Sequence, residues 1–406
     1  MTSRSAIAAG TPAFRRINRA MLFAGFSTFA LLYCVQPMMP LFAQSFALTP
    51  AESSLVLSVS SFALAFSLLV SSVVSDRLGR KNVMGFAMIG GGVLTLLCAL
   101  AQDFGQLLVL RALLGLALGG MPAAAMAYLA EEIDGPSLGL CMGIYIAGSA
   151  FGGMLGRALV SVIADFYDWR VALGAMGAAG LYSSFEFWRS LPASRNFVPR
   201  KVELSSLRAA LGAHLSDAGL PWLFALSFLL MGSFVSLYNY IGYRLLAAPY
   251  GLRPSIVGAF SVLYLVGMFS SVWAGRLSDR IGRRNVLWLV MGMMLAGLLI
   301  TLAQSLLLVG VGMALFTFGF FASHSVASSW VGLRARVAPA FASALYLFFY
   351  YLGSSVLGSW SGVLWGRWGW GGVVAVLGLA LSVALAVALR MRGVAPLVPQ
   401  TAPAAC

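Results

Sequence analysis

The sequence predicts an all-α membrane protein with twelve transmembrane helices arranged in two six-helix halves. Its 406 residues are 60% hydrophobic and only 9% charged, whereas a soluble chain carries roughly 25% charged residues. The apolar residues form long segments, and one motif occurs once in each half. This composition excludes soluble enzymes, nucleic-acid-binding proteins and disordered scaffolds. The net charge of +14 therefore needs an explanation other than a nucleic-acid partner.

Each predicted helix is an apolar segment close to the roughly 20 residues that cross a bilayer. The first is longer than the apolar core of a signal peptide, about 7–15 residues, so we expect it to be retained. The twelve segments are 20–42, 53–75, 83–101, 106–129, 138–163, 170–188, 221–245, 255–275, 286–303, 307–331, 340–364 and 371–389. We expect an N-terminal half (20–188), a charged cytoplasmic linker (189–219), a C-terminal half (220–390) and cytoplasmic tails at 1–19 and 391–406.

The positions of the basic residues predict the orientation, because cytoplasmic loops of membrane proteins are enriched in Lys and Arg. With both termini in the cytoplasm, 20 of the 26 basic residues lie in cytoplasmic segments. Three lie in outer loops and three, Arg111, Arg157 and Arg244, lie within spans. The high net charge thus reports orientation in a bacterial inner membrane.

A repeated motif indicates that the two halves are parallel repeats. The nine residues from Ser75 to Val83 follow span two, and the nine from Ser278 to Val286 follow span eight. Seven of the nine positions are identical, at an offset of 203 residues, half the chain. Substrate sites in such folds lie near the membrane midplane between the halves.

These motifs resemble the major facilitator superfamily, over the whole chain. The resemblance rests mainly on the loop signature G-x-x-x-D-R-x-G-R-[KR]. The second copy of the motif has this signature in full, and the first copy has Ser72 in place of the first glycine. The resemblance implies an intracellular latch, in which a signature arginine pairs with an acid near the end of span four and holds the halves together when the carrier opens outward. The implied latch residues are Asp76, Arg77, Gly79, Arg80, Glu131, Glu132, Gly275, Asp279, Arg280, Gly282 and Arg283. No acid follows span ten, where Arg334 and Arg336 stand instead.

Spans four and five carry two further likenesses to the family. Arg111, Gly115 and Gly119 match R-x-x-x-G-x-x-x-G, and the family associates this arginine with proton coupling or substrate anions. The alternative is a structural arginine bonded to backbone carbonyls. The stretch 148–153 partly matches the antiporter signature G-P-x-x-G-G, with Ser149 for the proline; helix packing is the alternative for its glycines. The overall pattern resembles the drug:proton antiporter branch.

Polar side chains at helical spacing within the spans predict a central cavity, because such groups must face a cavity or one another. The residues we expect on the substrate and proton pathway are Tyr33, Gln36, Arg111, Tyr145, Arg157, Asn239, Tyr240, Tyr243, Arg244, His324, Tyr346 and Tyr350. Three embedded arginines favour an anionic or zwitterionic substrate over a lipophilic cation. His324 is a candidate proton carrier, or a neutral histidine bonded to hydroxyls. We expect Glu186 to pair with Arg189.

Together these features predict a secondary transporter that works by alternating access, with proton-coupled efflux of a small organic solute as the leading interpretation. A sugar, amino-acid or organic-acid carrier, working as exporter or proton symporter, is the alternative. The expected partners are the solute, protons and membrane lipid, and the expected state is a monomer. No nucleotide-binding or catalytic motif occurs, so we predict no enzyme activity and no cofactor. The four cysteines lack paired spacing and predict neither a disulfide nor a metal site.

Overall fold

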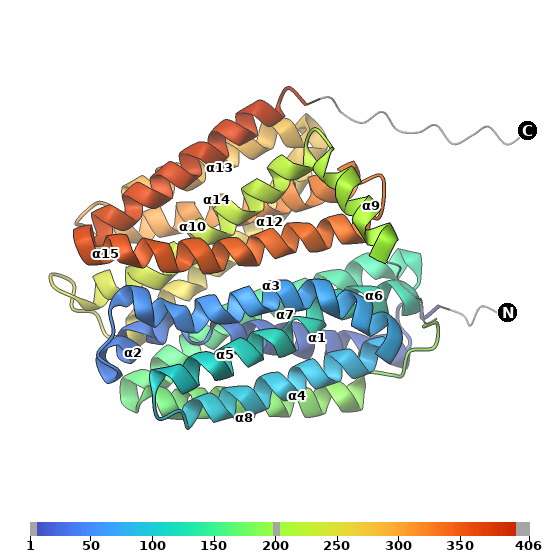
Figure 1. Cartoon of the computed structure of the whole chain (residues 1–406), viewed down its shortest axis with the longest axis horizontal. Helices are drawn as coiled ribbons and strands as arrows, with labels where there is room; N and C mark the ends of the chain where they lie inside the picture. The colour runs from blue at the N-terminus through green and yellow to red at the C-terminus, as the bar shows by residue number, and fades with distance from the viewer. Residues whose placement is uncertain (1–5, 198–203, 395–406) are drawn as a thin grey trace, which may run out of the picture.

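The computed structural model describes residues 6–197 and 204–394, and it is built from helices stacked in two halves (Figure 1). The N-terminal half contains α1 (Pro12–Tyr33), η1 (Gln36–Met38), α2 (Met39–Ser45), α3 (Pro50–Leu78), α4 (Arg80–Ala99), α5 (Phe104–Leu118), α6 (Gly120–Glu132), α7 (Gly135–Phe166) and α8 (Trp169–Ser190). The C-terminal half contains α10 (Leu220–Leu246), α11 (Pro254–Ala259), η2 (Phe260–Leu263), α12 (Tyr264–Ile281), α13 (Arg283–Ile300), α14 (Leu306–Arg334) and α15 (Pro339–Met391). The connecting segment holds α9 (Leu204–Leu215).

These elements form the twelve predicted crossings. Ten helices of the described chain are long and apolar enough to span a membrane. One of them, α15, holds the last two predicted spans, joined at Gly369 with φ +57°. The remaining crossing is α8, whose last turns carry Glu186 and Arg189. The fold class predicted from the apolar segments is therefore confirmed.

Three local features of the described chain add to the predicted set of spans. Pro37 interrupts the first crossing, as its missing N–H requires: α1 ends at Tyr33 and the chain continues through the short helix η1. The linker, predicted only as a charged segment, contains the helix α9, and part of it (198–203) lies outside the described residues. The first helix also begins earlier than predicted, at Pro12, where Thr11 accepts a hydrogen bond from the Phe14 amide.

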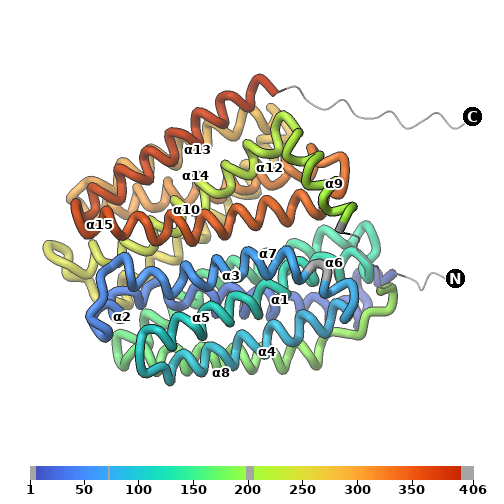
Figure 2. Tube along the Cα trace, viewed as in Figure 1, coloured from blue at the N-terminus to red at the C-terminus, as the bar shows by residue number. Residues whose placement is uncertain are grey.

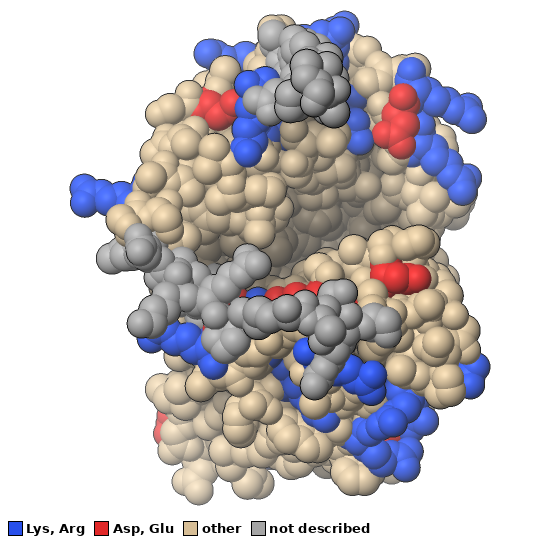
Figure 3. Space-filling view, turned by 90° about the vertical axis from the view of Figure 1, so that its right-hand side faces the viewer, with Lys and Arg blue, Asp and Glu red and all other residues tan. Residues whose placement is uncertain are grey.

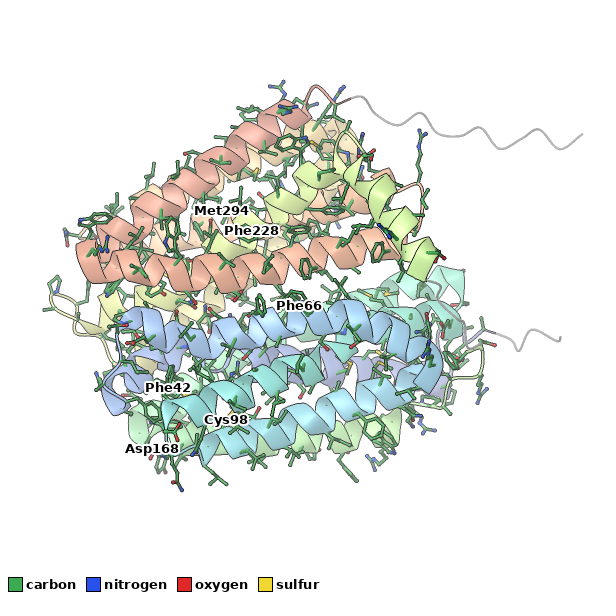
Figure 4. All side chains as sticks on the ribbon, in the orientation of Figure 1. Phe42, Phe66, Cys98, Asp168, Phe228 and Met294 are labelled. Atoms are coloured by element: carbon green, nitrogen blue, oxygen red, sulfur yellow. The ribbon has the colours of Figure 1, made fainter. Side chains whose placement is uncertain are left out.

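The two halves face each other along their long helices. The tube in Figure 2 shows the N-terminal half (blue to green) below the C-terminal half (yellow to red), with the start of α1 and the end of α15 on the same side. We call that side the terminal face and the other side the opposite face. Helices α3 and α7 of the first half lie against α15 and α11 of the second. Phe66 of α3 points toward α15 (Figure 4), where its ring meets that of Phe348 at 5.2 Å.

Glycine contacts repeat between the halves and set the closest helix pairs. A Cβ on Gly152 of α7 would lie 2.0 Å from the Phe26 carbonyl oxygen of α1. A Cβ on Gly353 of α15 would lie 2.0 Å from the Phe228 carbonyl oxygen of α10. Only glycine permits this backbone approach. Gly152 in span five and Gly353 in span eleven thus pack directly against a neighbouring helix backbone.

Candidate functional site

Arg157 is a buried cation near the interface of the two halves. It lies on α7 with 4% of its surface exposed. Its Nε donates to Gln36 Oε1 at 2.6 Å and its Nη1 donates to the Gly153 carbonyl at 2.6 Å. The guanidinium carbon lies 4.5 Å from the centre of the Tyr33 ring and 5.0 Å from that of Tyr264. Tyr264 belongs to the C-terminal half, so both halves contribute to the surroundings of this charge.

Gln36 connects Arg157 to the other half. Its Nε2 donates to Asn239 Oδ1 at 2.7 Å and to the Val235 carbonyl of α10 at 3.2 Å. The break at Pro37 places this amide in η1, outside the regular helix. A cavity of about 30 Å³ adjoins it, lined by residues that include Arg157, Tyr238 and Ser261. Such a volume holds roughly two water molecules.

A continuous set of aromatic rings lies beside Arg157 on the helices of the C-terminal half. Tyr264 packs edge-on against Phe234, with ring centres 5.6 Å apart. Phe234 stacks on Phe320 at 3.8 Å, and Phe320 stacks on the His324 ring at 6.1 Å. His324 lies 4.8 Å from the Tyr350 ring. These rings give the arginine an apolar, planar neighbourhood.

His324 is held by one polar contact in this aromatic group. Its Nδ1 lies 3.0 Å from the Tyr346 hydroxyl, and the tautomer decides which of the two donates. The imidazole is partly exposed, whereas Tyr346 is buried at 2%. A histidine with hydroxyl and aromatic neighbours only can gain or lose a proton without breaking an ion pair.

The interface is closed at the opposite face. Ser53 of α3 and Tyr243 of α10 are hydrogen-bonded at 2.5 Å. Nearer the edge, Asp165 of α7 pairs with Arg253 at 3.2 Å and accepts a hydrogen bond from Ser255 at 2.5 Å. Each of these contacts joins the N-terminal half to the C-terminal half.

The terminal face is open by contrast. The space-filling view in Figure 3 looks onto this face and shows a hollow between the two halves, with Lys and Arg side chains on both sides of it. The central residues are thus closed off on one side of the molecule, while the halves are separated on the other.

Two of the three embedded arginines differ from the expectation that they line a positive cavity. Arg111 is fully buried, and its guanidinium donates to the carbonyls of Val56, Leu31 and Leu32 at 2.6–3.0 Å. Arg244 lies in the last turn of α10 and donates to carbonyls at the end of α13, including that of Ala303 at 2.8 Å. Arg111 thus joins α5 to backbone carbonyls of α1 and α3, and Arg244 joins α10 to carbonyls just beyond α13. Arg157 is the embedded arginine that lies between the halves.

The tyrosines predicted for the pathway also differ in their surroundings, and some of them lie near Arg157 and His324. Tyr240 is fully buried and donates to the Gly358 carbonyl at 2.7 Å, so it ties α10 to α15. Tyr243 belongs to the closure with Ser53 described above. Tyr33, Tyr346 and Tyr350 lie around Arg157 and His324. Tyr145 is buried on α7.

Sequence reasoning missed several residues of this region. In the sequence, Phe234 and Phe320 cannot be distinguished from ordinary apolar residues of a span. Tyr264 is a polar aromatic residue inside a span, and this was a usable signal. Asp165 fell just beyond the predicted fifth span, whereas α7 continues to Phe166. Its partners lie about 90 positions away in the sequence, and no spacing pattern connects them.

The loops after α3 and α12, which carry the two copies of the signature, adopt the same turn. Gly79 and Gly282 both have φ +87°, a value that favours glycine. Arg80 pairs with Asp76 at 2.6 Å and with Glu131 at 2.8 Å. In the second copy Arg283 pairs with Asp279 at 3.2 Å. A Cβ on Gly275 would meet nothing within 4 Å, so close packing does not explain that glycine.

These loop contacts differ from the expected latch in one respect. Every pair named above joins helices of a single half, and none crosses to the other half. Glu132 contacts no signature arginine; it accepts hydrogen bonds from the backbone amides of Arg195 and Asn196, at 2.5 and 2.8 Å. The halves are apart at this face, so the signature residues are left with partners in their own half.

In the C-terminal half Arg334 replaces the acid of the first copy and finds its partner elsewhere. Its Nε donates to Asp217 at 2.5 Å, in the turn before α10. Burial acts to raise the pKa of Asp217, but the Arg334 guanidinium and the amides of Gly219 and Leu220 hold that pKa below its ordinary value. Glu186 pairs with Arg189 at 3.2 Å, as expected, and also with Arg19 of α1.

Comparison with known proteins decides the family. The family described as Major Facilitator Superfamily matches residues 21–358. The chain belongs to the major facilitator superfamily. It is 49% identical to the inner membrane transport protein YnfM of Escherichia coli, over 94% of this chain and 92% of that one. It is 47% identical to the uncharacterized MFS-type transporter YybF of Bacillus subtilis, over 93% of each chain.

A solved structure shares the fold of this major facilitator protein. The crystal structure of a mutant of the nucleoside transporter NupG covers 92% of this chain and 99% of its own, with a TM-score of 0.77 and 15% sequence identity. The family membership makes this chain a multi-pass transport protein and not an enzyme. The predicted family, fold class and general activity are thus confirmed.

Proposed function

We propose that this major facilitator protein exports a small organic solute across the bacterial inner membrane in exchange for protons. The observation that carries the proposal is the asymmetry around Arg157. The halves are joined on the opposite face through contacts such as Asp165 with Arg253, and they are separated at the terminal face (Figure 3). A transporter that alternates between two such states exposes one central site to each side of the membrane in turn.

The distribution of charge supports an assignment of the terminal face to the cytoplasm. Lys and Arg side chains lie on both sides of the hollow at this face (Figure 3), and basic residues favour the cytoplasmic side. In this orientation the state described here faces inward and can load solute from the cytoplasm. Loading from the cytoplasm is the first step of export.

His324 is the residue we propose for proton exchange. The groups against its ring are the hydroxyl of Tyr346 and the rings of Tyr350 and Phe320, none of which is charged. Among the described residues it forms no ion pair, and an imidazole can take up and release a proton. Export by exchange also agrees with the drug:proton antiporter branch that the motifs resemble.

An organic-acid symporter is the second candidate, and Arg157 is the observation that favours it. A cation with neutral partners between the halves suits a negatively charged solute in either direction of transport. The direction of solute movement relative to the proton gradient separates the two functions.

Transport by purified protein in proteoliposomes tests the proposal. Proton flux is followed with a pH-sensitive dye while a panel of organic acids, sugars and amines is supplied. Exchange predicts solute movement opposite to protons, and His324→Gln should abolish the pH dependence of the rate. The control is His214→Gln, which removes the other histidine, located on α9 against the Phe341 ring. Unchanged pH dependence in His324→Gln would contradict the coupling role, and movement of solute with protons would favour the symporter.

A further inference from the structure

The charge of Arg157 is uncompensated inside the protein. Among the described residues no carboxylate lies within ion-pair distance of its guanidinium. Its polar contacts are the Gln36 amide, the Gly153 carbonyl and the Tyr264 side chain, all of them neutral. A buried charge without a counter-charge is unfavourable by several kcal/mol. An anion placed against this group would remove that penalty.

Arg111 shows that the chain can satisfy an embedded arginine when structure alone requires it. Three backbone carbonyls accept from Nε, Nη1 and Nη2 of Arg111, which is fully enclosed. Arg157 instead lies at the contact of the halves, with tyrosine rings from each half over its guanidinium. The two arginines are both buried but have different surroundings, and a cavity of about 30 Å³ adjoins Arg157.

A second, independent observation lies next to Arg157. The Tyr33 side chain is 2% exposed, and its hydroxyl has no hydrogen-bond partner among the described residues. Buried hydroxyls without partners are rare and call for a specific explanation. The Tyr33 ring lies under the guanidinium, with its centre 4.5 Å from the guanidinium carbon. A carboxylate bound by Arg157 would supply the missing acceptor.

The aromatic residues beside the arginine indicate the remainder of the ligand. Tyr264 contacts Phe234 at 5.6 Å and Phe321 at 5.4 Å, and the stacked pair of Phe234 and Phe320 extends this surface toward His324. Planar apolar groups pack favourably on such rings, face-on or edge-on. Sugars, with hydroxyls all round, would need more hydrogen-bonding side chains than these.

We propose that the site between the halves binds a small aromatic monocarboxylate, with its carboxylate on Arg157 and Tyr33 and its ring among Tyr264, Phe234 and Phe320. This inference rests on the proposed transport function, since it names the class of solute carried. The guanidinium fork matches a carboxylate with two parallel hydrogen bonds. No covalent step is involved.

Ligand-induced stabilisation of the purified full chain tests this inference, because a ligand that binds the folded state raises its melting temperature. The probes are benzoate, phenylacetate and 4-hydroxybenzoate. Benzyl alcohol lacks the charge, benzylamine reverses it and acetate lacks the ring. We expect the three aromatic acids to raise the melting temperature in a concentration-dependent way and the other compounds to have no effect. Stabilisation by none of the three acids, or equal stabilisation by benzyl alcohol, would overturn the inference.

Two variants locate the binding. Arg157→Lys keeps the charge and loses the fork, and we expect it to raise the Kd of benzoate by about tenfold or more, as expected for a lost hydrogen bond to a charged group. Tyr33→Phe keeps the ring and its packing, so it remains informative if Arg157→Lys folds poorly; it should weaken benzoate binding by several-fold. Tyr128→Phe is the matched control, because its hydroxyl bonds to Pro192 at the terminal face. Wild-type affinity in both site variants would overturn the assignment to Arg157.

Transport measurements separate this inference from the function on which it rests. Exchange of protons for an amine or a sugar, with no binding of the aromatic acids, would leave secondary transport standing and overturn the anion site. Binding of benzoate without movement of any solute under a pH gradient would support the anion site and contradict the transport proposal.

Discussion

Gln36 accepts a hydrogen bond from Arg157 at 2.6 Å and donates one to Asn239 at 2.7 Å. One amide therefore contacts both the embedded cation of the N-terminal half and a polar residue of the C-terminal half. A ligand that draws the guanidinium away from Gln36 also changes the contact of Gln36 with α10. This arrangement offers a direct physical connection between occupancy of the site and separation of the halves at the opposite face.

Replacing Gln36 with glutamate should supply the missing counter-charge. In Gln36→Glu the new carboxylate lies where Oε1 accepts from Arg157, so it should form a charge-assisted pair and compete with any anionic ligand. We expect the Kd of benzoate to rise by roughly tenfold or more. The melting temperature should change little, because the new ion pair is offset by the loss of the hydrogen bonds that Nε2 donates to Val235 and Asn239. Isothermal titration and thermal unfolding in detergent measure the two effects. Gln36→Leu, which cannot pair with the arginine, is the comparison; equal affinity in the two variants would contradict this interpretation.

Close helix approach at glycine should make two equivalent positions sensitive to a single methyl group. We expect Gly152→Ala and Gly353→Ala each to lower stability by about 1–3 kcal/mol, since the added carbon meets a carbonyl oxygen and the helices must separate. Gly143→Ala on α7 and Gly366→Ala on α15 are the matched controls, because a Cβ there meets nothing within 4 Å. Unfolding in detergent, followed by circular dichroism, gives the comparison. Equal stability of the Gly152 and Gly143 variants would show that α1 and α7 are not packed this closely.

The repeat explains why so much of the fold was predictable. The duplicated motif places Gly79 and Gly282 at matching turns, and the sequence spacing alone identifies both. Apolar segment length then gives the crossings, because a bilayer requires about 20 apolar residues in each. The glycine contacts follow the same repeat, with Gly152 and Gly353 at equivalent places.

The candidate site was predictable only in part, because the type of a residue does not reveal which neighbouring helix its side chain faces. Arg111, Arg157 and Arg244 looked alike in the sequence, as cations within spans. Their roles separate only when the partner helix is known: Arg111 and Arg244 meet backbone carbonyls of their own half, and Arg157 meets tyrosine rings from both halves. Tyr264 reaches the site from α12, the other half of the protein, and local periodicity carries no information about that contact.

Arg111 should affect stability more than ligand binding. Its loss removes three hydrogen bonds that a charged group donates to carbonyls of α1 and α3, each worth about 1.5–3 kcal/mol, although the Ser60 hydroxyl still donates to the Val56 carbonyl and the Cys34 thiol to that of Leu31. We therefore expect Arg111→Leu to lower the free energy of unfolding by roughly 3 kcal/mol or more. Benzoate affinity of the folded fraction should stay within about twofold of wild type, a change below the 1.4 kcal/mol that corresponds to tenfold. Tryptophan fluorescence titration and thermal unfolding give both quantities. A stable variant that no longer binds benzoate would assign Arg111 to the site.

Loss of Asp165 should open the opposite face. In Asp165→Ala the pair with Arg253 and the hydrogen bond from Ser255 disappear together. Arg253 is 62% exposed, so its pair contributes about 0.2–1 kcal/mol, and the hydrogen bond adds about 1 kcal/mol. A shift of about 1 kcal/mol changes the ratio of closed to open molecules by roughly fivefold. Opening is measured with a second substitution, Ser261→Cys. Ser261 is 3% exposed, and its hydroxyl donates to the Met154 carbonyl of the other half. When this face opens, the new thiol should react with a membrane-impermeant maleimide added at the opposite face. We expect Asp165→Ala to raise this labelling rate several-fold. Glu52→Gln is the matched control, because Glu52 is an acid on the same face whose described partner is Thr49 at the start of its own helix. Equal labelling in the Asp165 and Glu52 variants would show that the Asp165 contacts do not hold this face closed.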